Sequence, residues 1–86
     1  MTRARDNAER GLGLLKGAIL ETLAVSKSGL TNAEVSDALG IRSDYLGKQK
    51  DYLSWSLLGL LLNEGSIQRQ GRRYTLSPNA GDLPVK

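Results

Sequence analysis

Apolar residues recur along the first third of the chain at the spacing of an amphipathic helix. Intervals of three and four residues place them on one helical face, with a more polar surface opposite. The large members of this stripe are Leu12, Leu15, Ile19 and Leu23. Gly29 follows the stripe and is a plausible end of this helix, while residues 1–10 either fray or extend it.

The second predicted helix is marked by the residues at its two ends. Thr31 and Glu34 have the spacing of a capping box, in which each side chain accepts the backbone N–H of the other residue. Leu30 and Val35 flank this box as the pair that forms a hydrophobic staple. Gly40 then offers a left-handed residue at which a helix of about two turns ends.

A third segment is rich in leucine and helical towards its C-terminal end. One face of it carries Leu53, Leu57, Leu60 and Leu61, and this face is broadened by Leu58 and Leu62. Gly59 lies inside this run, where glycine costs helix stability, so we expect it to mark a close approach to another helix. The start of this helix is open. Either Ser43 caps a very long helix, or a loop containing Gly47 leads to a helix that begins nearer Lys50 or Asp51.

Beyond the third helix the apolar period changes from helical to alternating. Ile67 opens one strand, Tyr74 and Leu76 continue a returning strand, and all three side chains can face the core. A tight turn at Gln70-Gly71 or Gly71-Arg72 joins the two strands. An isolated two-stranded hairpin is weak, so we expect it to pack against the helices.

The length of 86 residues allows one domain, and a core rich in leucine and poor in aromatic residues favours packed helices. We therefore predict a mainly α fold with a small β-hairpin. The domain spans residues 11–78, after a flexible or helix-extending arm of residues 1–10 and before a disordered tail of residues 79–86.

The order of a helix, a short capped helix, a longer helix and a hairpin resembles the winged helix-turn-helix family. The resemblance covers roughly residues 12–78 and is carried by residues 30–41, 57–67 and 71–76. It implies a three-helix bundle plus a wing, with the second helix of the helix-turn-helix in the major groove and the wing along the phosphate backbone. One departure stands out, because the span from Gly40 to Gly65 exceeds the family spacing by around two helical turns.

Composition argues against most enzyme chemistries. The chain has no cysteine and no histidine, which excludes disulfides, thiolate metal sites and the usual neutral-pH proton shuttle. No Walker-type phosphate loop is present, and the nine acidic residues are scattered. We expect no enzyme activity, no cofactor, no metal and no small-molecule ligand.

The sequence also bears on location. No stretch reaches the ~18 apolar residues of a membrane span, and the charged start lacks the apolar run of a signal peptide. We expect no membrane partner and a cytoplasmic, nucleoid-associated protein.

Twelve Lys and Arg residues against nine Asp and Glu give a net charge of +3, which favours a polyanionic partner. Arg69, Arg72 and Arg73 surround the hairpin turn, with Gln68 and Gln70 as uncharged donors. Neutralising closely spaced DNA phosphates with such side chains releases counterions. The alternative is a basic hairpin that is merely solvated.

The candidate DNA-binding residues lie on the hairpin, in the connection after the second helix and at the start of the third. They are Arg42, Ser43, Lys48, Gln49, Lys50, Tyr52, Ser54, Arg69, Gln70, Arg72 and Arg73. Lysine and arginine suit phosphates, and glutamine can pair with adenine. Tyr52 is as readily a core-edge tyrosine, whereas Trp55 and Tyr74 are interpreted as packing residues.

These features predict a winged-helix protein that binds double-stranded DNA, as a small bacterial or archaeal transcription regulator or a DNA-recognition module. A homodimer would let it read two half-sites. Two alternatives remain: a winged-helix protein–protein interaction domain within a larger complex, and RNA binding through the same basic face. The excess of leucine in the third helix and an exposed Trp55 would support the protein-interaction domain. A continuous positive face over hairpin and third helix would favour DNA, and a contiguous apolar patch would favour a protein partner.

Overall fold

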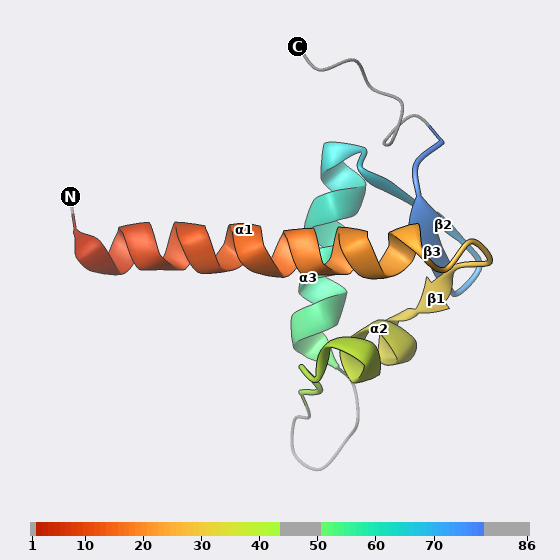
Figure 1. The fold of residues 1–86 in the computed structure, drawn as a ribbon, viewed down its shortest axis with the longest axis horizontal. Coiled ribbons are helices and arrows are strands. Elements are labelled where there is room, and N and C mark those ends of the chain that lie inside the picture. Colours follow the sequence, from red (N-terminus) through yellow and green to blue (C-terminus); the bar gives the residue numbers. More distant parts are fainter. Residues whose placement is uncertain (1, 44–50, 79–86) are drawn as a thin grey trace.

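Three helices and a three-stranded antiparallel sheet make up the part of the chain that the computed structural model describes, residues 2–43 and 51–78 (Figure 1). The elements are α1 (Arg3–Ala24), β1 (Leu30–Thr31), α2 (Asn32–Leu39), α3 (Tyr52–Glu64), β2 (Ile67–Gln70) and β3 (Arg73–Leu76). This confirms the predicted helices and hairpin. β1 is an addition, because two residues are too few for an alternating pattern to reveal a strand.

Helix α1 begins earlier than its apolar stripe. The hydroxyl of Thr2 accepts the backbone N–H of Arg5 at 3.1 Å, which caps the helix before its first residue. Residues 3–10 are therefore a helical extension, one of the two alternatives for this segment. This part of α1 projects away from the other elements (Figure 1), and its side chains are exposed.

Only the C-terminal half of α1 packs into the core. Ile19 and Leu23 are buried, whereas Leu12 of the same predicted stripe is 37% exposed and Leu14 is 70% exposed. Lys16 pairs with Glu64 and thereby ties the middle of α1 to the end of α3. The apolar stripe of α1 thus continues beyond the part of the helix that the domain covers.

Gly29 does not end α1, which stops at Ala24 with Val25 as its C-cap. Instead, Gly29 has φ of +89° and lies against the last strand. A Cβ atom at this position would stand 2.8 Å from Thr75 Cγ2 and 3.0 Å from the carbonyl oxygen of Tyr74. Glycine is required here because the chain passes β3 too closely for a side chain.

Helix α2 has the predicted capping box. The Thr31 hydroxyl accepts the N–H of Glu34 at 3.2 Å, and the Glu34 carboxylate accepts the N–H of Thr31 at 2.9 Å. Gly40 follows the helix with φ of +69°, and the N–H of Ile41 bonds to the carbonyl of Ser36 at 2.9 Å. Both ends of α2 are therefore fixed by local sequence.

Helix α3 begins at Tyr52, with Asp51 as its N-cap residue, in agreement with the alternative of a late start. Its buried face consists of Ser54, Leu57, Leu58 and Leu61. Leu53 and Leu60, predicted to face the core, are 42% and 40% exposed. The prediction that Gly59 marks a close approach to another helix is also wrong, because a Cβ atom there would meet nothing within 4 Å. The helix is rotated relative to the predicted apolar face.

In the sheet, β3 lies between β1 and β2. Tyr74 of β3 pairs with Leu30 of β1 and with Arg69 of β2. The hairpin turn is Gly71-Arg72, the second of the two alternatives, and Gly71 has φ of +63° at the first turn position, as type II′ turns require.

One core joins the helices to the hairpin. It contains Ile19, Leu23, Val35, Leu57, Leu58, Leu61, Ile67 and Tyr74. Tyr74 is 3% exposed, which confirms its interpretation as a core residue. Within residues 2–43 and 51–78, none of the helices combines the length and the apolar character that a membrane span needs.

Candidate nucleic-acid interface

The three hairpin arginines differ in what they contact. Arg69 donates from Nε to the carbonyl of Gly71 at 2.7 Å, and its guanidinium lies 5.5 Å from the centroid of the Tyr74 ring. Arg72 is exposed at the turn and makes no hydrogen bond or ion pair with any described residue. Both arginines are exposed on the hairpin, but neither of them pairs with a carboxylate of the described residues.

Arg73 is partly engaged inside the domain. Its Nη1 atom donates to the carbonyl of Gly29 at 2.7 Å and lies 3.7 Å from Glu34 Oε1. Both side chains of this ion pair are about half exposed. Arg73 therefore links β3 to the start of α2, and part of its charge is neutralised by Glu34.

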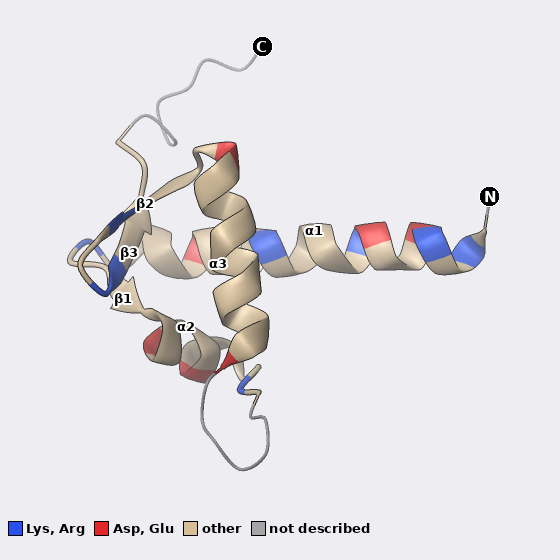
Figure 2. Ribbon diagram, turned by 180° about the vertical axis from the view of Figure 1, so that it is seen from behind, with Lys and Arg blue, Asp and Glu red and all other residues tan. Residues whose placement is uncertain are grey.

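The exposed ridge of α3 carries no charge. Its members recur at spacings of four, three and four residues, which place them on one helical face. They are Tyr52, Ser56, Gly59 and Asn63, here called the α3 ridge, and all four are exposed. Figure 2 shows blue arginines on the hairpin and no blue on α3. The described hairpin and α3 thus do not form one continuous positive face.

Trp55 lies between the α3 ridge and the hairpin. It is 58% exposed, so its interpretation as a packing residue is wrong. The rotation of α3 explains this, because burial of Ser54 and Leu58 turns the intervening Trp55 outward. The exposure of Trp55 can be predicted from the sequence only if the polar residue Ser54 is placed on the buried face of the helix.

Two hollows of about 540 and 490 Å³ share Trp55, Arg69 and Tyr74. The first reaches Arg72 and the start of α2, and the second runs past Ser56 and Gly59 to Asn63. Together they form an open channel between α3 and the hairpin, here called the α3–hairpin groove. The groove brings Arg69 and Arg72 next to the indole ring of Trp55, and Arg69 also lines the part that runs along Ser56, Gly59 and Asn63.

Arg42 and Ser43 contact residues at the start of α3 and stabilise it. Arg42 Nε lies 3.5 Å from Asp51 Oδ1, and its Nη1 lies 3.9 Å from Asp37 Oδ1. The Ser43 hydroxyl accepts the N–H of Leu53 at 2.9 Å, and the Ser43 N–H bonds to Asp51 Oδ1 at 3.4 Å. Ser43 thus supplies the side-chain cap that Asp51 itself does not make.

Asp51 and Ser54 are buried beneath the first turn of α3. Asp51 is 2% exposed, with φ of +52°, and Ser54 is fully buried. The Ser54 hydroxyl lies 2.5 Å from Asn32 Oδ1 and 3.2 Å from the Asp51 carbonyl. The prediction that Ser54 faces DNA is therefore wrong, because its hydroxyl is satisfied inside the protein. This set, Arg42, Ser43 and Asp51 with Asn32 and Ser54, is called the junction below.

The structure divides the predicted site residues into three groups. Arg69, Gln70 and Arg72 are exposed on the hairpin, and Tyr52 is 46% exposed on the α3 ridge. Arg42, Ser43 and Ser54 belong to the junction, and Arg73 links two elements. Lys48, Gln49 and Lys50 lie outside the described residues. Sequence reasoning missed Trp55, Ser56 and Asn63.

No family model matches the chain, and neither a curated protein nor a solved structure matches it. Across residues 2–43 and 51–78, no three His, Cys, Asp or Glu side chains gather in a way that could hold a metal ion. A functional assignment therefore rests on the geometry of the groove, the ridge and the hairpin.

Proposed function

We propose that this chain is a winged-helix domain that binds double-stranded DNA, as a small bacterial or archaeal transcription regulator or a DNA-recognition module. One observation carries the proposal: Arg69 of the hairpin lines a groove together with Ser56, Gly59 and Asn63 of α3, and Arg72 lines the continuation of this groove past Trp55. Three helices on a small sheet, the last two strands of which form a basic hairpin, are also what the resemblance to the winged helix-turn-helix family implies.

The two sides of the groove suit two different tasks. Arginine on the hairpin can neutralise phosphates, which supplies affinity without sequence preference. A helix is narrow enough to enter the major groove, where Tyr52, Ser56 and Asn63 present hydroxyl and amide groups to base edges. Gly59 adds no side chain in the middle of the ridge, so the helix backbone can approach a partner closely there.

A second candidate is a protein-interaction domain, and exposed leucines favour it. Leu53 of α3 does not line the groove, and Leu12 and Leu14 lie on the part of α1 that extends beyond the core. Such side chains would be covered by a second copy of the chain or by another protein. The described surface lacks the continuous positive face that would have favoured DNA. We nevertheless propose DNA as the partner, because these leucines are spread over two elements whereas Arg69 shares one groove with Ser56, Gly59 and Asn63.

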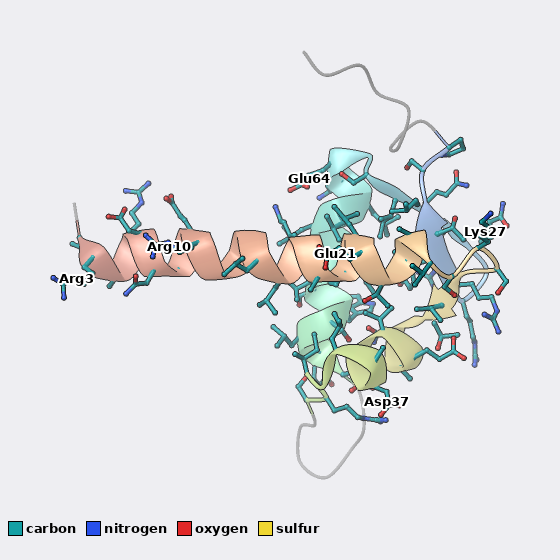
Figure 3. All side chains as sticks on the ribbon, viewed as in Figure 1. Arg3, Arg10, Glu21, Lys27, Asp37 and Glu64 are labelled. Carbon is teal, nitrogen blue, oxygen red and sulfur yellow. The ribbon has the colours of Figure 1, made fainter. Side chains whose placement is uncertain are left out.

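The test is a titration of a labelled duplex with the protein at several salt concentrations. The double variant Arg69→Ala, Arg72→Ala should weaken binding by roughly tenfold and reduce the salt slope by about 2, since two phosphate contacts are removed. The matched control is Arg3→Ala, Arg10→Ala, which removes the same charge from the far end of α1 (Figure 3).

Binding that falls equally in both double variants would point to diffuse electrostatic attraction rather than a site on the hairpin. An intact chain that binds no duplex even at low salt would overturn the proposal. Thermal unfolding of each variant checks that the hairpin remains folded, because Arg69 also contacts Gly71 and Tyr74.

A further inference from the structure

The exposed ridge of α3 lacks the side chains that most often read G·C pairs. From Tyr52 to Asn63 it contains no Asp, Glu, Lys or Arg. Guanine is read chiefly by arginine or lysine, and the amino group of cytosine by a carboxylate. From Tyr52 to Asn63, α3 therefore carries no charged group with which to prefer these bases, and its last residue, Glu64, pairs with Lys16 of α1.

What α3 offers instead is apolar surface beside small polar groups. The Trp55 indole is 58% exposed and the Tyr52 ring is 46% exposed, next to Ser56 and the open position of Gly59. In the major groove, the C5-methyl group of thymine is the apolar feature that a side chain can contact, and asparagine suits the adenine beside it. The ridge thus matches the edges of A·T pairs.

The packing of its neighbours in the core sets the position of Trp55 on α3. Ser54, Leu57 and Leu58 are buried and set the rotation of α3. The backbone N–H of Trp55 bonds to the carbonyl of Asp51 at 3.0 Å, in the first turn of the helix. The indole is therefore presented from a rigid element, and its exposure is not needed to complete the core.

The charges around Trp55 favour DNA over an apolar protein surface as its occupant. Arg69 and Arg72 line the same groove, and the nearby carboxylate of Asp51 is buried and paired with Arg42. A duplex that places a phosphate strand against these arginines would bring base edges towards the indole. Positive charge at the rim and apolar surface inside are complementary to a phosphate backbone that borders methyl-bearing bases.

We propose that α3 recognises thymine C5-methyl groups in the major groove, with Trp55 as the principal apolar contact. This inference rests on the proposed DNA-binding function and names the feature of DNA that the ridge reads. The target is then an A·T-containing duplex in which the methyl groups contribute to affinity.

The experiment compares pairs of A·T-rich duplexes of identical sequence, synthesised either with thymidine or with deoxyuridine. Deoxyuridine removes only the methyl group and leaves charge and base pairing unchanged. The intact chain should bind the thymidine duplex more tightly, by about fourfold for each methyl group that becomes buried. Trp55 is the only tryptophan, so its fluorescence should also change on binding and report contact directly.

Trp55→Ala should bind both duplexes equally and retain the salt slope of the intact chain. Leu53→Ala is the matched control, because Leu53 is an exposed apolar residue of α3 that does not line the groove. This variant should keep the preference for thymidine. Arg72→Ala should weaken binding to both duplexes and leave their ratio unchanged.

Equal affinity of the intact chain for the two duplexes would overturn the inference while leaving DNA binding in place. A thymidine preference that persists in Trp55→Ala would overturn the role of Trp55. Absence of binding to any duplex would instead refute the proposed function itself, so the two failures are distinguishable.

Discussion

Arg42 and Arg72 look alike in the sequence, since each is a basic residue beside a turn, but the structure uses them differently. Arg42 lies 3.5 Å from Asp51 and 3.9 Å from Asp37, and it helps to hold the start of α3. Arg72 has no such partner among the described residues and stands at the tip of the hairpin. The junction and the hairpin therefore differ in whether a carboxylate lies within reach.

The buried carboxylate of Asp51 explains the difference. A charged group that is 2% exposed needs a cation and hydrogen-bond donors, and Arg42 and the N–H of Ser43 supply them. The hairpin strands contain no acidic residue, and the ion pair that the described hairpin arginines make is the one between Arg73 and Glu34 of α2. A count of basic residues thus does not predict how many are available to a polyanion. That number depends on which basic residues pair with a carboxylate in the folded chain.

The largest effect is expected from Asp51→Ala. It removes the partner of Arg42 and places alanine at φ of +52°, which alanine adopts less readily than aspartate. We expect the free energy of unfolding to fall by about 3 kcal/mol, below the upper range for buried pairs because Arg42 is partly exposed. Urea unfolding followed by Trp55 fluorescence measures this loss.

Asp51→Asn is the matched control for this change. Asparagine tolerates the left-handed conformation and can still accept the N–H of Ser43, so about half of the loss should be restored. DNA affinity of the folded protein should change little in either variant. A junction variant of full stability that no longer binds DNA would show that these residues face the ligand after all.

A smaller loss is expected from Ser54→Ala, which removes a buried hydroxyl and leaves the side-chain amide oxygen Oδ1 of Asn32 without this donor. The cost should be about 1–2 kcal/mol of unfolding free energy. Ser56→Ala, two residues away on the ridge, should change stability by less than about 0.5 kcal/mol. For DNA affinity, by contrast, Ser56→Ala should have the larger effect of the two. A Ser56 variant as unstable as the Ser54 variant would contradict the observed rotation of α3.

Local signals in the sequence predict the helix ends and the hairpin well. The capping box of Thr31 and Glu34, the left-handed Gly40 and the turn at Gly71 are all decided within a few residues, so they can be identified without the fold. The rotation of α3 cannot be predicted in this way. A buried serine looks polar in sequence, and its burial is stabilised by Asn32, 22 residues earlier.

The candidate site is only half predictable for the same reason. Arg69 and Arg72 are adjacent to a recognisable turn, and their exposure follows from the hairpin itself. Whether Arg42 is available depends on Asp51, which lies nine positions further along the chain. The exposure of Trp55 depends on which leucines of α3 the core selects. Both are tertiary effects that composition and spacing do not contain.

The comparison of Arg42 with Arg72 can be tested by replacing each with alanine. Arg42→Ala should lower the unfolding free energy by about 1 kcal/mol or slightly more and leave the salt slope of DNA binding unchanged. Asp51 loses its cation, but it keeps the N–H of Ser43, and truncation of the partly exposed arginine lets water reach the carboxylate. Arg72→Ala should leave stability within about 0.5 kcal/mol and reduce the salt slope by about 1. If the two variants change the unfolding free energy and the salt slope by the same amounts, the distinction between junction and hairpin is lost.

The smallest effect concerns Arg73, which stands between these two cases. Glu34→Gln removes the negative charge 3.7 Å from Arg73, while glutamine can still complete the capping box and Arg73 keeps its bond to Gly29. Because this ion pair is half exposed, stability should change by less than about 0.5 kcal/mol.

DNA affinity at low salt should rise by roughly two- to threefold in Glu34→Gln, since the hairpin then presents more net positive charge to a phosphate. Glu21→Gln makes the same charge change on α1 (Figure 3), and it should raise affinity less if the site is at the hairpin. Fluorescence titration of both variants with one duplex at one salt concentration decides the matter. Equal gains would mean that affinity follows net charge alone, whereas a loss in Glu34→Gln would mean that Glu34 positions Arg73 for binding rather than competing with DNA for it.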